Sequence, residues 1–229
     1  MYWHLIPVPL VLVVIGIYGV ARAKNDLKRV AVVQPLGTIL TIAVCALSLF
    51  TPHAVVGFTV FILAGLILAL IGDFLNLDMT DQKVVMVGLV IFVFAYLVYG
   101  IGIAFYNGFG TVDLVLAAVF LVVLVALMAY LWPGLGPMKL PVIIYSVIYC
   151  FMVSRAVSTF FGDFFSMTQA ILLTAGAFML FIGDILFAII SYKKPAPPRF
   201  VVSLNLIGPC LYTGGQLLIA LAPSYFTGG

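Results

Sequence analysis

Long, uninterrupted apolar runs are the feature that most constrains how this chain of 229 residues can fold. A membrane-spanning helix needs about 20 mostly apolar residues, and runs of that length recur along the sequence. Apolar residues make up 66% of the chain and charged residues only 7%, against about 25% charged residues in typical soluble domains. A membrane β-barrel would alternate polar and apolar residues, whereas 112–131 is apolar at almost every position. The sequence therefore predicts an all-α, polytopic membrane protein.

Turn residues between the apolar runs predict eight transmembrane helices in a single membrane domain that covers residues 1–229. The first run is followed by basic residues without a small-residue cleavage pattern, so we interpret it as a retained helix rather than a signal peptide. The predicted spans are 5–21, 33–51, 55–77, 84–106, 111–131, 140–158, 167–191 and 200–222.

Basic residues predict the orientation of these spans, because cytoplasmic loops are enriched in Lys and Arg. Nine of the ten basic residues lie in or beside the odd-numbered loops, so we expect these loops in the cytoplasm and both termini on the other side. Such clusters are expected to meet anionic lipid headgroups rather than nucleic acid. The tenth, Arg155, falls within the sixth span, where we expect its head to reach the outer edge and meet Asp163.

An internal repeat relates the two halves of the chain. Residues 64–75 align with residues 175–186, 111 positions later, and six of the twelve positions are identical, including a Gly-Asp pair. This predicts a four-plus-four duplication, with halves of about 1–107 and 108–229, around an axis along the membrane normal. In the same scheme, Pro35 and Pro141 each open the second span of their half.

The aspartates of the repeat, Asp73 and Asp184, are the candidate catalytic residues. A carboxylate in the middle of a membrane helix costs about 2.5–3.5 kcal/mol, which favours a functional role, although local capping or pairing stays an alternative. We expect both to line one polar pocket at matching depth near the cytoplasmic edge.

Further polar residues are candidates for substrate binding at that pocket. Asn76 shares a helix face with Asp73, and Tyr145 lies at a similar depth; an interfacial aromatic belt is the alternative for Tyr145. Tyr212 and Gln216 could line the pocket or hold helices together. The three cysteines and two histidines lack the spacing of a metal site, so no metal or other cofactor is expected.

Several motifs in this order and spacing resemble the YhhN family of membrane lysoplasmalogenases, which are eight-span proteins. The resemblance covers residues 34–221. It rests on the motifs Ile71-Gly72-Asp73-Phe74-Leu75 and Phe181-Ile182-Gly183-Asp184-Ile185-Leu186-Phe187-Ala188, on Gly88, Leu89, Phe92 and Tyr99, on Pro141, Val142, Tyr145, Met152, Arg155 and Ala156, and on Tyr212 with Gln216-Leu217-Leu218-Ile219-Ala220.

The resemblance implies hydrolysis of the vinyl ether bond of lysoplasmalogens to a fatty aldehyde and glycerophosphoethanolamine or glycerophosphocholine, without a metal. It carries the catalytic role onto Asp73 and Asp184, and adds Tyr96 and Tyr99 as candidate substrate-binding residues. Two positions depart from the family pattern: Gln34 stands where a Lys is common, and Tyr96 stands where a His is common. Tyr96 cannot titrate near neutral pH as a His does.

Our hypothesis for the chemistry is acid-catalysed hydration of the enol ether, with one carboxylic acid as proton donor and one carboxylate to stabilise positive charge and orient water. Either Asp could take either role. The alternative is a proton- or cation-coupled transporter or a lipid-binding protein that uses the same pair. The pair lies toward one membrane face only, which favours the hydrolase with a lysophospholipid substrate. The headgroup and the oligomeric state stay open.

Overall fold

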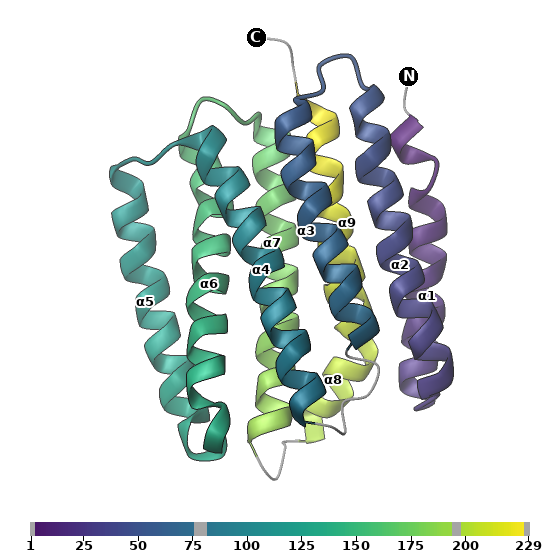
Figure 1. The fold of residues 1–229 in the computed structure, drawn as a ribbon, viewed down its shortest axis with the longest axis vertical. Coiled ribbons are helices and arrows are strands. Elements are labelled where there is room, and N and C mark those ends of the chain that lie inside the picture. Colours follow the sequence, from purple (N-terminus) through teal and green to yellow (C-terminus); the bar gives the residue numbers. More distant parts are fainter. Residues whose placement is uncertain (1–2, 76–81, 194–197, 227–229) are drawn as a thin grey trace.

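A computed structural model describes residues 3–75, 82–193 and 198–226, which form an all-helical bundle (Figure 1). Helices satisfy every backbone hydrogen bond within one segment, as a bilayer requires. Seven of these helices are long and apolar enough to cross a membrane. They are α1 (Val8–Ala23), α2 (Leu27–Leu47), α3 (Val56–Leu75), α4 (Gln82–Asn107), α5 (Thr111–Leu131), α6 (Lys139–Ser158) and α7 (Met167–Tyr192).

The segment predicted as the eighth span, 200–222, is not one of these seven and is divided among three consecutive helical pieces. These are α8 (Pro198–Pro209), a π-helical turn (Cys210–Gly214) and α9 (Gly215–Leu221). Pro209 lacks a backbone N–H, and the wider π-helical turn follows it directly. Short 3₁₀ helices adjoin the ends of the longer helices, at Trp3–Leu5, Ser48–Phe50, Trp132–Gly134, Gly136–Met138, Thr159–Phe161 and Ala222–Tyr225.

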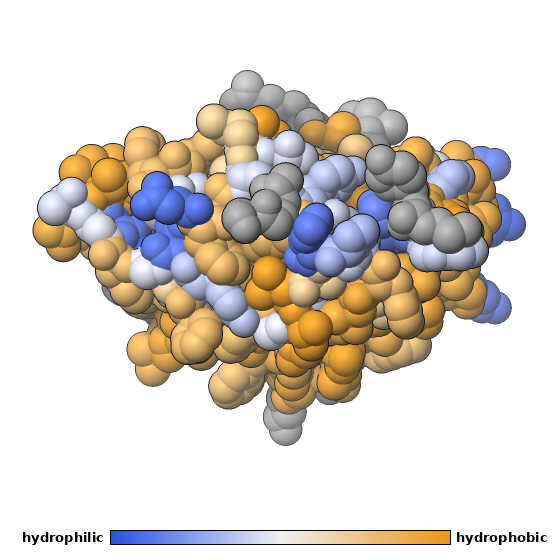
Figure 2. Space-filling model, turned by 90° about the horizontal axis from the view of Figure 1, so that it is seen from above, coloured by the Kyte–Doolittle hydropathy of each residue, from blue (hydrophilic) through white to orange (hydrophobic). Residues whose placement is uncertain are grey.

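Successive helices run up and down, so that α1 begins and α9 ends at the same end of the bundle (Figure 1). Most neighbours in sequence pack together, but α4 packs on α6 instead of α5, and α2 also packs on α9. Viewed end-on, polar residues gather across the face of the bundle and hydrophobic residues cover its flanks (Figure 2). This distribution is the one expected for a bundle surrounded by lipid.

The second helix begins earlier than the predicted span of 33–51. It starts at Leu27, where the Asp26 side chain caps it by accepting a hydrogen bond from the Arg29 N–H at 3.1 Å. Basic side chains in this first turn stay exposed, so the helix extends beyond its apolar stretch. Pro35 therefore lies inside α2 and does not open it, whereas Pro141 lies in the first turn of α6, where proline is tolerated.

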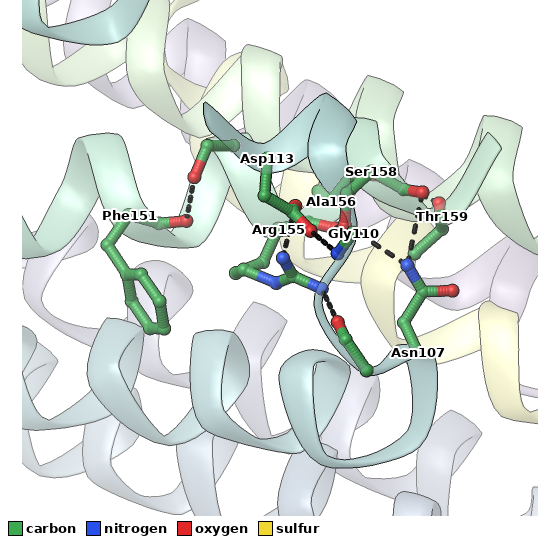
Figure 3. Close-up of polar contacts among 10 residues, drawn as sticks. Asn107, Gly110, Asp113, Phe151, Arg155, Ala156, Ser158 and Thr159 are labelled. Carbon is green, nitrogen blue, oxygen red and sulfur yellow. Dashed lines mark hydrogen bonds and ion pairs between the residues drawn. The ribbon is translucent and has the colours of Figure 1, made fainter. Parts of the chain in front are cut away.

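Arg155 is buried, and its expected pairing with Asp163 is wrong (Figure 3). Its Nη1 pairs with Asp113 in the first turn of α5, and its Nη2 donates to the backbone carbonyl of Gly108. Asn107 Nδ2 donates to the Ser158 carbonyl at 3.1 Å in the same region. These contacts tie the connection between α4 and α5 to α6, so this cation serves the fold.

Glycines allow two close approaches in the core. A Cβ on Gly176 of α7 would lie 2.6 Å from the Gly215 carbonyl oxygen of α9, and one on Gly65 of α3 would lie 2.2 Å from the Tyr99 ring of α4. Small residues of this kind let membrane helices pack backbone to backbone or against a ring. They bring α7, α9, α3 and α4 together around the buried polar groups described next.

Candidate active site

Asp73 lies two residues before the end of α3, and its side chain is completely buried. Three side chains donate hydrogen bonds to it: Gln34 Nε2 at 2.8 Å, Thr38 Oγ1 at 2.5 Å and the Tyr212 hydroxyl at 2.6 Å. Gln34 and Tyr212 donate to Oδ1, and Thr38 donates to Oδ2. An ionised carboxylate offers about four acceptor positions, so this set of donors holds Asp73 in one orientation.

A second layer of hydrogen bonds supports the donors of Asp73. Gln34 Oε1 accepts from the Tyr18 hydroxyl at 2.7 Å, and Arg22 Nη2 lies 3.5 Å from that hydroxyl. Thr38 Oγ1 also lies 3.1 Å from Gln216 Oε1. The neutral amide of Gln34 thus uses both its oxygen and its nitrogen in hydrogen bonds. Polar contacts run without a break from Arg22 and Tyr18 on α1, through Gln34, to Asp73.

Asp184 lies eight residues before the end of α7 and is half-buried. Tyr96 of α4 donates to its Oδ2 at 3.2 Å, and Tyr145 of α6 donates to the same oxygen. Oδ1 accepts no hydrogen bond from the part of the chain that the structure describes. Tyr149 stacks on Tyr96, with ring centroids 4.3 Å apart. One oxygen of Asp184 is therefore held by two phenols while the other is free for a ligand.

A cavity of about 170 Å³ lies beside Asp184, and its volume is more than ten times what one water molecule needs. Asp184, Arg22 and Tyr18 supply polar groups to its lining, and leucines of α5 supply apolar wall. The residues that line it are Tyr18, Arg22, Gln34, Leu89, Phe92, Tyr96, Leu127, Leu131, Val142, Tyr145, Ser146, Tyr149, Leu180, Phe181, Gly183, Asp184, Ile185, Phe187, Ala188, Tyr192, Leu204, Gly208, Pro209 and Tyr212.

The structure places the predicted site residues in two groups. Those that line the cavity are Asp184, Tyr96, Tyr145 and Tyr212. Those behind its wall are Asp73, Gln216 and Tyr99, so the expectation that both aspartates line the pocket is wrong for Asp73. Tyr99 packs on Gly65, and its buried hydroxyl has no hydrogen-bond partner among residues 3–75, 82–193 and 198–226. Asn76 lies outside the described residues.

Five further residues of the site escaped the sequence prediction: Tyr18, Arg22, Gln34, Thr38 and Tyr149. The repeat contained a signal for some of them, because Gln34 and Thr38 precede Tyr145 and Tyr149 by the same 111 positions that separate the aspartates. Within the described ranges, no three His, Cys, Asp or Glu side chains come together in the manner of metal ligands.

Comparison with family models gives a match over most of the chain. A family model described as the YhhN family matches residues 30–222. No curated protein and no solved structure gave a match. The matched region contains both aspartates and every side chain that donates to them, whereas Tyr18 and Arg22 lie before it.

Proposed function

This chain belongs to the YhhN family, and from that premise we propose that it is a lysoplasmalogenase-like hydrolase of the membrane. It cleaves the vinyl ether bond of lysoplasmalogens and releases a fatty aldehyde with glycerophosphoethanolamine or glycerophosphocholine. The observation that carries the proposal is a carboxyl group, Asp184, that faces a largely apolar cavity with one oxygen held by two tyrosines and the other free.

The cavity suits an amphipathic substrate. Leu127, Leu131 and Val142 supply apolar wall for the alkenyl chain, while the tyrosines and Asp184 lie where the ether oxygen and its double bond would sit. Substrate pockets commonly combine apolar walls with a few polar groups that fix orientation. We therefore propose that the vinyl ether binds beside Asp184 Oδ1.

In the first step, Asp184 acts as general acid. Its Oδ1 transfers a proton to the alkenyl carbon that is not bonded to oxygen, the double-bond electrons form the new C–H bond, and the ether oxygen shares the positive charge of the resulting oxocarbenium ion. The carboxylate left behind accepts hydrogen bonds from Tyr96 and Tyr145. Hydrogen bonds to an ionised group are stronger than those to a neutral one, so both tyrosines stabilise the developing charge.

In the second step, the Asp184 carboxylate acts as general base. It takes a proton from water while the water oxygen attacks the oxocarbenium carbon, which gives a hemiacetal and restores the acid. The hemiacetal carbon then breaks its bond to the glycerol oxygen while the proton of the hemiacetal hydroxyl is transferred to that oxygen, which yields the aldehyde and the alcohol with one water consumed. The stacked rings of Tyr96 and Tyr149 offer aromatic faces to the cation.

Asp73 has a different role in this proposal. It is buried behind the wall and its donors Gln34 and Tyr212 both line the cavity. Asp73 therefore fixes the positions of these two side chains, and its negative charge lies behind the reacting cation. The two aspartates of the repeat become one catalytic residue, Asp184, and one positioning residue, Asp73.

We also propose that the two halves of the chain, about 1–107 and 108–229, arose by duplication, with the basic ends of the helices in the cytoplasm. Each aspartate receives hydrogen bonds from the second helix of its own half and one from the other half. Tyr96 of α4 reaches Asp184 on α7, and Tyr212 of the last segment reaches Asp73 on α3. A two-fold axis through the cavity would relate these pairs.

The decisive experiment measures aldehyde release and the incorporation of solvent deuterium into the aldehyde. Purified protein in lipid nanodiscs is incubated with lysoplasmenylethanolamine in D₂O, and the aldehyde is trapped and weighed by mass spectrometry. Protonation at carbon predicts an aldehyde with one deuterium on the carbon next to the carbonyl. Asp184→Asn should abolish release, whereas Asp163→Asn, which changes an exposed carboxyl outside the cavity, should not.

The transporter alternative makes a different prediction in the same preparation. Liposomes that contain the protein would then show a proton or cation flux that Asp73→Asn and Asp184→Asn abolish, and no aldehyde would form. That outcome would overturn the hydrolase proposal.

A further inference from the structure

Arg22 differs from the other basic residues around it. It lies in the last turn of α1, is half-buried and lines the same cavity as Asp184. Lys24, Lys28 and Arg29 follow within a few residues, and all three are exposed and outside the cavity. A general preference for basic residues at the cytoplasmic edge explains the exposed three, but it does not require one of them to enter a cavity wall.

The charge of Arg22 is unpaired within the described part of the chain. Its guanidinium carbon lies 5.7 Å from the centre of the Tyr18 ring and its Nη2 lies 3.5 Å from the Tyr18 hydroxyl, and these contacts hold it beside Tyr18. The two other arginines whose side chains are described each have an aspartate partner: Asp26 for Arg29 and Asp113 for Arg155. A half-buried cation without a carboxylate partner is suited to an anionic ligand.

We propose that Arg22 binds the phosphate of the lysophospholipid headgroup and makes the enzyme selective for phosphate-bearing substrates. A guanidinium presents two parallel N–H donors to a phosphate. Arg22 of α1 and the leucines Leu127 and Leu131 of α5 line the cavity from opposite sides of the bundle, with α7, which carries Asp184, between them (Figure 1). This order matches that of phosphate, ether and hydrocarbon chain in a lysophospholipid. The assignment of the ether to Asp184 rests on the proposed function.

A binding experiment tests this inference without turnover. The full-length protein in nanodiscs is titrated with a saturated 1-alkyl lysophosphoethanolamine, which has no vinyl ether to cleave, and with the matching 1-alkylglycerol, which has no phosphate. Arg22→Gln should raise the Kd of the phospholipid by about tenfold to a hundredfold and leave the Kd of the alkylglycerol unchanged. Arg22→Lys should give an intermediate Kd, because it keeps the positive charge and loses the two parallel N–H donors of the guanidinium. The matched control, Lys28→Gln, should change neither Kd.

The alternatives give distinct results. An equal loss for both ligands would assign Arg22 to the packing of Tyr18 and overturn the inference, as would no loss for either. Displacement of the phospholipid by inorganic phosphate from wild-type protein, but not from Arg22→Gln, would make this a site for the free anion and also overturn it. Arg22-dependent binding without aldehyde release from lysoplasmalogen would overturn the hydrolase and keep the phosphate site. Aldehyde release from lysoplasmalogen by a protein that binds the alkyl lysophosphoethanolamine and the alkylglycerol with the same Kd would overturn the phosphate site and keep the hydrolase.

Discussion

Gln34 and Tyr145 each donate a hydrogen bond to the aspartate that follows 39 residues later in the chain. Their own separation, 111 positions, equals the offset of the sequence repeat. One turn further along the same helix faces, Thr38 and Tyr149 have the same offset. The equivalence supports the proposed duplication and shows how the copies differ: on the second helix of the first half an amide and a hydroxyl donate to Asp73, while the equivalent positions of the second half carry phenols near Asp184.

Replacing Asp184 by Asn should reduce aldehyde release by at least about a hundredfold, because general acid–base catalysis contributes about 10²–10⁴. Asn is nearly isosteric and keeps an oxygen for Tyr96 and Tyr145, so the thermal midpoint should change little. Initial rates with lysoplasmenylethanolamine, together with unfolding curves in the same detergent, measure both. Full activity in this variant would remove Asp184 from the mechanism.

Replacing Asp73 by Asn should act mainly on stability and positioning. An amide nitrogen would face one of the donors Gln34, Thr38 or Tyr212, and an unsatisfied buried polar group costs about 1–3 kcal/mol. We expect a lower melting temperature and a rate that is reduced but still measurable. Thr38→Val, which removes one donor and keeps the shape, should show a milder form of both effects. A loss of activity as complete as in Asp184→Asn, in a fully folded protein, would contradict this division of roles.

Tyr145→Phe removes one of the two hydrogen bonds to Asp184 Oδ2. A hydrogen bond to a charged group is worth about 1.5–3 kcal/mol, so kcat should fall by about tenfold or more, while KM changes less. Tyr130→Phe provides the matched control, because that ring is exposed on α5 and lies outside the cavity. Equal rates for the two variants would show that the phenol does not assist the carboxyl.

Gly176→Ala should destabilise the bundle, because the new Cβ would lie 2.6 Å from the Gly215 carbonyl, and a backbone atom cannot rotate away. Overpacking of this kind costs about 1–3 kcal/mol. Gly16→Ala makes the same chemical change on α1 with no heavy atom within 4 Å, and it should be neutral or stabilising by up to about 1 kcal/mol. Thermal unfolding of the two variants side by side measures the difference.

Asp113→Ala should leave the buried Arg155 guanidinium without its charge partner and cost about 3–5 kcal/mol. Arg29→Ala removes an exposed ion pair with Asp26 and should cost about 0–1 kcal/mol. Both effects are measured by chemical or thermal unfolding. A cost for Asp113→Ala as small as for Arg29→Ala would show that the pair at the end of the bundle does not stabilise the fold.

The sequence predicted the helices more securely than their contacts. The fifth span, 111–131, coincides with α5, because Gly110 precedes it and Asp113 accepts a hydrogen bond from the Gly110 N–H. The hydropathy pattern placed the start of α2 six residues late. The first turn contains charged residues, so hydropathy gives no sign that the helix begins there, at the Asp26 cap.

Partners across the bundle were harder to predict, because they depend on which helices become neighbours. Arg155 was paired with Asp163, eight positions away, yet its partner Asp113 lies 42 positions away on α5. The repeat identified Asp73 and Asp184 but could not reveal that one would face the cavity and the other would lie behind it. That difference arises from Gln34 and Tyr212, which stand between Asp73 and the open space.

The π-helical turn Cys210–Gly214 separates α8 from α9, and the two helices make different contacts. Upstream of it, Leu204 and Gly208 border the cavity with Tyr212; downstream, Gln216 is buried beside Thr38. Each residue advances an α-helix by about 100°, so removing a single residue from this turn would swing α9 around its axis and carry Gln216 away from Thr38. Substitutions in this turn leave the rotation of α9 relative to α8 unchanged, whereas a change in length by one residue alters it. The number of residues in this turn is therefore a stricter requirement than their chemical type.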